Sequence, residues 1–146
     1  MAQDRYHLAG VMGFPVLHSR SPKIHNHWLA EHGLKGAYVL LEVKQEGLHA
    51  ALKALPALGF AGCNLTIPHK EAAIAAMDSL EANVKRIGAM NCVVVRPDGS
   101  LHGMNNDGYG WVQSIKERYA DWRADAGPVV VLGAGGGARA VVAGLM

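Results

Sequence analysis

The sequence has few of the features that would assign it to several large classes of protein. Among its 146 residues there are only two cysteines, Cys63 and Cys92, too few and too far apart for a disulfide framework or a cysteine zinc site. No apolar run reaches the ~18 residues that a membrane-spanning helix needs. The first ten residues, MAQDRYHLAG, lack the charged lead and apolar core of a signal peptide. We therefore expect a protein of the reducing cytoplasm with no membrane partner.

The sequence also contains few charged residues. Charged residues make up 18% of the chain, the net charge is +2 with neutral histidines, and no basic cluster is interleaved with aromatic residues. We therefore expect no nucleic-acid partner. Half of the residues are hydrophobic, which is enough to bury the core of one ordinary domain, or of a small domain plus part of another.

Short apolar runs alternate along the chain with segments of helical periodicity. The runs predict strands over residues 6–12, 37–43, 59–66, 90–96, 100–104 and 129–132. The remaining segments predict helices over residues 21–33, 46–55, 68–77, 80–87 and 108–120, and a last helix from Ala138. Strands separated by helices indicate an α/β fold with a mainly parallel sheet and flanking helices. A hairpin is expected at Pro97-Asp98-Gly99.

The segment VVVLGAGGGARA near the end of the chain fits a dinucleotide-binding fingerprint, with Gly133, Gly135 and Ala138 at its three small positions. It follows an apolar run and opens a helix, which is the context that the fingerprint requires. The alternative is a turn that is merely rich in glycine. The residue that separates NAD from NADP is expected ~20 positions further on, past Met146.

The last predicted helix reaches Met146 with no second strand after it, and one strand with one helix cannot bury both faces of a sheet. We therefore expect the chain to stop inside a second domain. The predicted division is a first domain over 1–104, a connecting helix and linker over 105–126, and the start of a nucleotide-binding domain over 127–146.

The stretch CNLTIPHKEAA places Lys70 in the first turn of a predicted helix, where the helix dipole disfavours a cation by ~0.3–1 kcal/mol. It follows Asn64 and Thr66, whose side chains hydrogen-bond well and pack poorly. One interpretation of this arrangement is an ammonium aimed at a ligand. The alternative is a solvated lysine on a helix face.

Four other polar residues have two interpretations each. Ser19 and Ser21 are candidate ligand-binding hydroxyls, but a serine before a proline is also an ordinary helix start. Asp107 stands at the entrance to a helix, a routine capping position. Asn91 begins an apolar run, so its amide either ties down a loop or faces a ligand.

The eight histidines do not make a metal site. Those that share one predicted helix, His25, His27 and His32, are not paired at the i, i+4 spacing of a helical two-histidine site. We therefore expect no metal. The sequence also contains no Gly-x-Ser-x-Gly elbow and no Cys/His nucleophile arrangement.

Taken together, the motifs HSRSPKIHN, NLTIPHK, GAMN, NNDG and GAGGGAR closely resemble, in this order and spacing, the shikimate dehydrogenase family. The resemblance covers essentially the whole chain. It implies an N-terminal α/β domain that holds the substrate, a Rossmann-type domain that holds NADP, and a reaction site in the cleft between them. A homodimer is left open.

The resemblance also implies roles for individual residues. Ser19 and Ser21 match the hydroxyls that hold the substrate carboxylate. The groups around the ring hydroxyls are matched by Asn64, Thr66, Asn91 and Asp107. Lys70 matches a catalytic lysine that works beside Asp107. The phosphate-binding turn and its helix start are matched by Gly133, Ala134, Gly135, Gly136, Gly137, Ala138 and Arg139.

The implied activity is the reversible, NADP-dependent reduction of 3-dehydroshikimate to shikimate in aromatic amino-acid biosynthesis. One position departs from the family pattern, because Asn106 stands where the family usually has threonine. This departure keeps open a related substrate such as quinate. NAD also stays open as the cofactor, because the residue that separates it from NADP is expected past Met146. A family glutamine and closing helices from a later part of the chain are absent, so a fragment that binds substrate without turnover is the remaining alternative.

Overall fold

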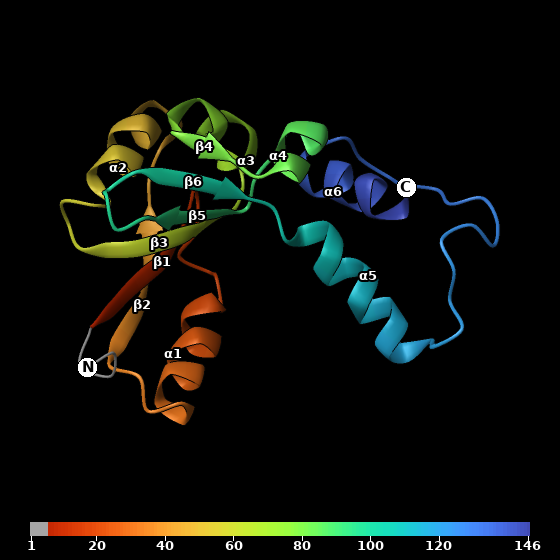
Figure 1. Cartoon of the computed structure of the whole chain (residues 1–146), viewed down its shortest axis with the longest axis horizontal. Coiled ribbons are helices and arrows are strands. Elements are labelled where there is room, and N and C mark those ends of the chain that lie inside the picture. The colour runs from red at the N-terminus through yellow and green to blue at the C-terminus, as the bar shows by residue number, and fades with distance from the viewer. Residues whose placement is uncertain (1–5) are drawn as a thin grey trace.

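Segments from the first two thirds of the chain meet in one six-stranded sheet with helices on both faces (Figure 1). The computed structural model describes residues 6–146. The strands are β1 (His7–Gly13), β2 (Gly36–Glu42), β3 (Phe60–Leu65), β4 (Ser79–Leu80), β5 (Cys92–Val95) and β6 (Leu101–Met104). The helices are α1 (Ser21–Glu31), α2 (Leu48–Ala54), α3 (His69–Ala72), α4 (Ala82–Ile87), α5 (Asp107–Arg118) and α6 (Gly136–Leu145), with 3-10 turns η1 (Gln45–Gly47) and η2 (Ala73–Ala76).

The strand order is β2-β1-β3-β5-β6-β4. Strand β1 pairs in parallel with β2 and β3, and β4 pairs in parallel with β6, whereas β5 is antiparallel to both β3 and β6. The α/β class is confirmed, and the antiparallel β5–β6 pair is the hairpin that the sequence predicts. Strand β4 was not predicted, because two residues are too short to show a period of two.

Neighbouring residues of β1 point to opposite faces of the sheet and join different parts of the core. Met12 packs with Leu52 and Leu65 on the face covered by α2, whereas Val11 packs with Tyr38 on the other face. Helix α1 covers that second face (Figure 1). The sheet is therefore a buried layer, and its strand ends carry the loops that hold the candidate site residues.

Helix α1 is attached to the edge strand β2 by one side chain. The amide of Asn26 donates to the backbone oxygen of Tyr38 over 2.9 Å and accepts from the backbone nitrogen of Tyr38 over 2.8 Å. These two bonds satisfy edge groups that have no strand beside them. They fix where α1 begins relative to the sheet, and the start of α1 carries Ser19 and Ser21.

Several predicted boundaries were wrong. The helix expected over 68–77 is divided between α3 and η2, and the last helix begins at Gly136 rather than Ala138. Ser21 does not cap α1; it is the first helical residue, and its N–H donates to Oγ of Ser19 over 3.3 Å. Asp107 is likewise the first residue of α5 and not its cap.

The strand expected over 129–132 is absent from the structure, which has no regular element between α5 and α6. Val130 and Leu132 are 83% and 94% exposed. Within residues 6–146 no other strand lies beside this segment, and an extended segment without a hydrogen-bonded neighbour does not form a sheet. Among the same residues, no helix is both long and apolar enough to cross a membrane.

Helices α5 and α6 contact each other through glycine. A Cβ atom on Gly108 would lie 2.6 Å from the backbone oxygen of Ala140, and one on Gly144 would lie 3.1 Å from the backbone oxygen of Gly108. The two backbones therefore touch where no side chain intervenes. Because Asp107 directly precedes Gly108, this contact also fixes the position of Asp107.

We predict that Gly108→Ala lowers the free energy of unfolding by about 1–3 kcal/mol, because its methyl group would collide with backbone. Gly110→Ala is the matched control in the same helix, since no atom would lie within 4 Å of its Cβ. The control should gain roughly 0.5–1 kcal/mol from helix propensity. Urea unfolding followed by circular dichroism measures both, and equal stability of the two variants would contradict the close contact between α5 and α6.

Candidate active site

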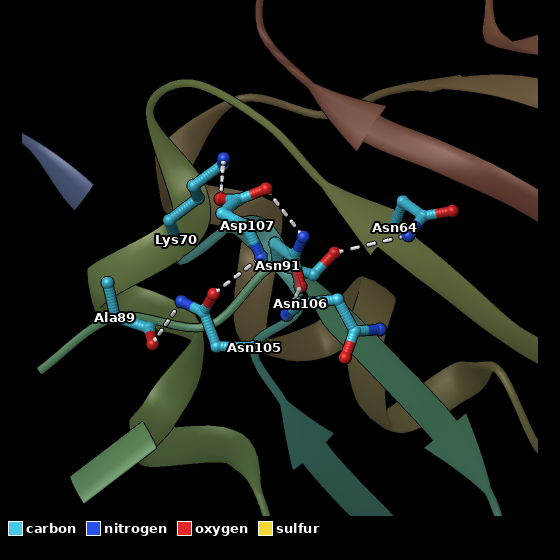
Figure 2. Close-up of polar contacts among 7 residues, drawn as sticks. All are labelled: Asn64, Lys70, Ala89, Asn91, Asn105, Asn106 and Asp107. Atoms are coloured by element: carbon cyan, nitrogen blue, oxygen red, sulfur yellow. Dashed lines mark hydrogen bonds and ion pairs between the residues drawn. The ribbon is translucent and has the colours of Figure 1, made fainter. Parts of the chain in front are cut away.

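The end of β3, the start of β5 and the start of α5 meet beside α3. Two backbone bonds hold these segments together: the N–H of Met90 donates to the oxygen of Lys70 over 2.8 Å, and the N–H of Leu65 donates to the oxygen of Asn91 over 2.8 Å. Lys70, Asn91 and Asp107, which are distant in sequence, therefore lie together in space (Figure 2).

An ion pair between Lys70 and Asp107 is the centre of this group. Nζ of Lys70 lies 2.5 Å from Oδ2 of Asp107, and the side chains are 21% and 29% exposed. The other carboxylate oxygen, Oδ1, accepts from the amide of Asn91 over 2.7 Å. Both oxygens of Asp107 are thus occupied, which fixes the carboxylate and leaves the ammonium with further N–H groups to donate.

Asparagine side chains order the loop that leads into α5. Oδ1 of Asn91 accepts from the backbone N–H of Asn106 over 2.9 Å, and Oδ1 of Asn105 accepts from the backbone N–H of Asp107 over 3.0 Å. The amide of Asn105, which is 3% exposed, donates to the oxygen of Ala89 over 2.9 Å. Asn91 therefore ties down a loop, as one of its two interpretations predicted, and through that loop it positions Asp107.

Asn106, the position that departs from the family pattern, contacts the ion pair only indirectly. Its side chain is exposed and points away from Lys70 (Figure 2). Its backbone N–H is the group that Asn91 holds. The side chain of Asn106 therefore takes no part in the ion pair between Lys70 and Asp107.

Tyr38 belongs to the same network, although the sequence did not indicate it. Its hydroxyl donates to Oδ1 of Asn64 over 2.7 Å, and its ring stacks on that of His25 with 4.0 Å between centroids. Burial, reinforced by the thiols of Cys63 and Cys92, holds the pKa of Tyr38 well above its usual value, so the hydroxyl stays protonated and donates.

The hydrogen bond from Tyr38 fixes which way the amide of Asn64 points. Nδ2 of Asn64 then lies 3.3 Å from the oxygen of Asn91, which links it to the group around Asp107. No local signal could have found Tyr38, because an aromatic residue in a strand is most often core. For Asn105 there was a signal, since asparagine two residues before a helix start commonly accepts a backbone N–H.

Only one of the two serines lines a cavity of about 290 Å³ near the start of α1. Ser19 lines this cavity together with Phe14, Thr66 and Ile67, whereas Ser21 does not line it. The hydroxyl of Ser19 donates to that of Ser21 over 3.2 Å, so the pair forms one polar group at the start of α1.

A second cavity, of about 550 Å³, lies between Lys70 and the glycine-rich turn. Of the seven residues expected in the phosphate-binding turn, five line it: Gly133, Gly135, Gly136, Gly137 and Ala138. Ala134 does not, and Arg139 instead pairs with Glu71 across 3.1 Å. Because Thr66 and Ile67 line both cavities, the two spaces adjoin each other beside Lys70.

Other chemistries find little support in the part of the chain that the structure describes. It contains no group of three or more histidine, cysteine, aspartate or glutamate side chains placed to hold a metal ion. Burial raises the pKa of Cys63 to about 12, so its thiol is not a ready nucleophile.

A comparison with family models matches residues 11–93 to the shikimate dehydrogenase substrate binding domain. The NADP(+) shikimate dehydrogenase of Rhodospirillum rubrum is 56% identical over all 146 residues, which cover 52% of that protein. The chain therefore spans about half the length of the curated relatives it matches.

Solved structures match the fold over nearly the whole chain. Shikimate dehydrogenase from Aquifex aeolicus superposes with a TM-score of 0.90 at 37% identity, over 99% of this chain and 53% of that one. Shikimate 5-dehydrogenase from Thermus thermophilus, in complex with NADP(H) and shikimate, superposes with a TM-score of 0.86 at 40% identity, over 95% of this chain and 51% of that one. Through its substrate-binding domain, the chain belongs to the shikimate dehydrogenase family.

Proposed function

We propose that the protein carrying this chain is an NADP-dependent shikimate dehydrogenase, which reversibly reduces 3-dehydroshikimate to shikimate. The chain would supply the substrate domain (1–104), a connecting helix and linker (105–126) and the start of a Rossmann-type nucleotide-binding domain (127–146). The observation that carries the proposal is the Lys70–Asp107 ion pair, because Lys70 lines the cavity that adjoins the serine-lined one. The free thiols of both cysteines support a reducing, cytoplasmic location.

The smaller cavity suits a small hydroxylated acid. The hydroxyls of Ser19 and Ser21 would donate to the substrate carboxylate from the start of α1. Thr66 lines the same space, and the amides of Asn64 and Asn91 lie toward the ion pair. Each amide donates one N–H to another group of the protein and has a second N–H that would donate to a ring hydroxyl.

The larger cavity fits a dinucleotide. Gly135 is extended, with φ −72° and ψ 178°, and it leads directly into α6, whose first backbone N–H groups have no helical acceptor. Such a helix start favours the negative charge of a pyrophosphate. When bound, NADPH supplies the hydride that reduces the ketone.

Residues of this chain would donate the proton and hold its donor in place. Nζ of Lys70 donates to the ketone oxygen, and as the carbon takes up hydride the C=O electron pair forms an O–H bond with the lysine's proton. Lys70 is left neutral and takes a proton back from solvent. Asp107 holds Nζ in place, because Asn91 fixes its other oxygen.

We predict that Lys70→Ala lowers kcat of the complete protein by about 10²–10⁴-fold, the usual contribution of a positioned general acid. The Kd for shikimate should change much less, since other donors also hold the substrate. Lys85→Ala, which removes an exposed lysine from α4, is the control and should leave kcat unchanged. If Lys70→Ala has the same kcat as the unsubstituted protein, the proposed role of the lysine is wrong.

A substrate and cofactor panel tests the reaction itself. Shikimate and quinate are each oxidised with NADP and with NAD, and we expect the highest kcat/KM for shikimate with NADP. The exposed side chain of Asn106 gives no reason for a different substrate. A higher kcat/KM with quinate or with NAD would assign the protein to a sister activity.

We predict that Tyr38→Phe raises KM for shikimate about 5- to 10-fold, the value of one net hydrogen bond of about 1 kcal/mol, and leaves kcat within twofold. Without the hydroxyl, the amide of Asn64 keeps only its longer bond to the oxygen of Asn91 and is held less firmly. Tyr109→Phe removes a hydroxyl from a residue that is 72% exposed and should change neither constant. Steady-state kinetics measures both variants, and an unchanged KM in Tyr38→Phe would show that Asn64 needs no such support.

A further inference from the structure

The glycine-rich turn contains one glycine that the dinucleotide fingerprint does not explain. The fingerprint needs small residues at Gly133, Gly135 and Ala138 and leaves the two positions between the last two free. The structure separates these two positions. A Cβ on Gly136 would lie 3.1 Å from Cβ of Lys70 and 3.2 Å from Cβ of Ala89, whereas one on Gly137 would have no atom within 4 Å.

The atoms that face Gly136 leave too little room for a methyl group unless they shift. Favourable contacts between carbon atoms lie at about 3.5–4.0 Å, so a methyl group here needs its neighbours to retreat. Ala89 is fully buried, and its backbone oxygen accepts from the amide of Asn105. The backbone oxygen of Lys70 accepts from the N–H of Met90.

Two further contacts hold helix α6 in its position. Arg139 pairs with Glu71, the residue after Lys70, across 3.1 Å, and Ala140 lies against the backbone of Gly108 beside Asp107. The helix that opens the nucleotide turn thus contacts the neighbours of both members of the ion pair. Gly136 is the point at which it touches Lys70 itself.

We propose that Gly136 is a positioning residue for Lys70: the absence of a side chain there lets the stem of the lysine pack against the nucleotide turn and holds Nζ on Asp107. A methyl group at Gly136 displaces the stem and moves Nζ away from the carboxylate. The kinetic part of this proposal rests on the proposed dehydrogenase function. The geometric part depends only on Lys70 and Asp107.

The test compares Gly136→Ala with Gly137→Ala in the complete protein. Both changes add one methyl group to the same turn, so they are matched in helix propensity and in bulk near the phosphates. We expect Gly136→Ala to lower kcat about 10-fold, since its neighbours must give by a few tenths of an ångström and a displacement near 1 Å costs up to about 10²-fold. Gly137 also belongs to the phosphate-binding turn, so the Kd for NADP of the two variants should agree within threefold, whereas the loss of kcat should be larger in Gly136→Ala.

A second readout needs neither cofactor nor turnover. Lysines are reductively methylated with ¹³C in the complete protein, and the Lys70 resonance is identified by its loss in Lys70→Arg. The resonance should shift in Gly136→Ala and stay in place in Gly137→Ala. Thermal unfolding checks that Gly136→Ala is folded; a variant that fails to fold would overturn the proposal, because the contact would then support the fold rather than the lysine.

The outcomes are distinguishable. Absence of shikimate turnover in the unsubstituted protein would remove the proposed function, and the NMR comparison would still decide the role of Gly136. Equal behaviour of the two alanine variants in both readouts would overturn the inference. So would a loss of NADP affinity in Gly136→Ala with an unmoved Lys70 resonance, because Gly136 would then serve only the phosphates.

Discussion

The ion pair between Lys70 and Asp107 is the interaction on which the rest of the site depends. It joins α3, which follows the central strand β3, to the first residue of α5. A half-buried ammonium and carboxylate are stable together only when their remaining hydrogen-bond donors and acceptors also have partners. Asn91 supplies that for the carboxylate, and the loop ordered by Asn91 and Asn105 sets where α5 begins.

The lysine of this pair also lines one of two adjoining cavities. The serine-lined cavity and the glycine-lined cavity share Thr66, and Lys70 lines the second of them. A hydride donor on one side and a ketone on the other would therefore meet beside an ammonium whose counter-ion is already fixed. Such preorganisation is what stabilises charge that develops on oxygen in a transition state. Helix α6 contributes to it from the nucleotide side, through Gly136 and through its contact with Gly108.

The sequence predicted the class of the fold better than it predicted the contacts within the candidate site. Period and punctuation located five of the six strands, since these signals are local; β4 is too short to carry one. The prediction of a strand over 129–132 was wrong for a different reason. An apolar run indicates a strand, but the strand forms only where another strand lies beside it to hydrogen-bond. The family resemblance predicted that Lys70 works beside Asp107, and the ion pair confirms that they lie together, but no local pattern indicates a pairing across 37 positions. Tyr38 and the packing role of Gly136 could not be found, because both depend on tertiary contacts that no local pattern records.

The central claim is that Lys70 and Asp107 act as one unit, and a double-mutant cycle on kcat tests it most directly. Lys70→Ala, Asp107→Ala and the double variant are compared with the unsubstituted protein under saturating shikimate and NADP. The account predicts that the double variant loses about as much activity as Lys70→Ala alone, because residues that act as a unit are strongly non-additive. If the two single losses multiply in the double variant, each residue acts independently, and the ion pair is not the element that organises the site.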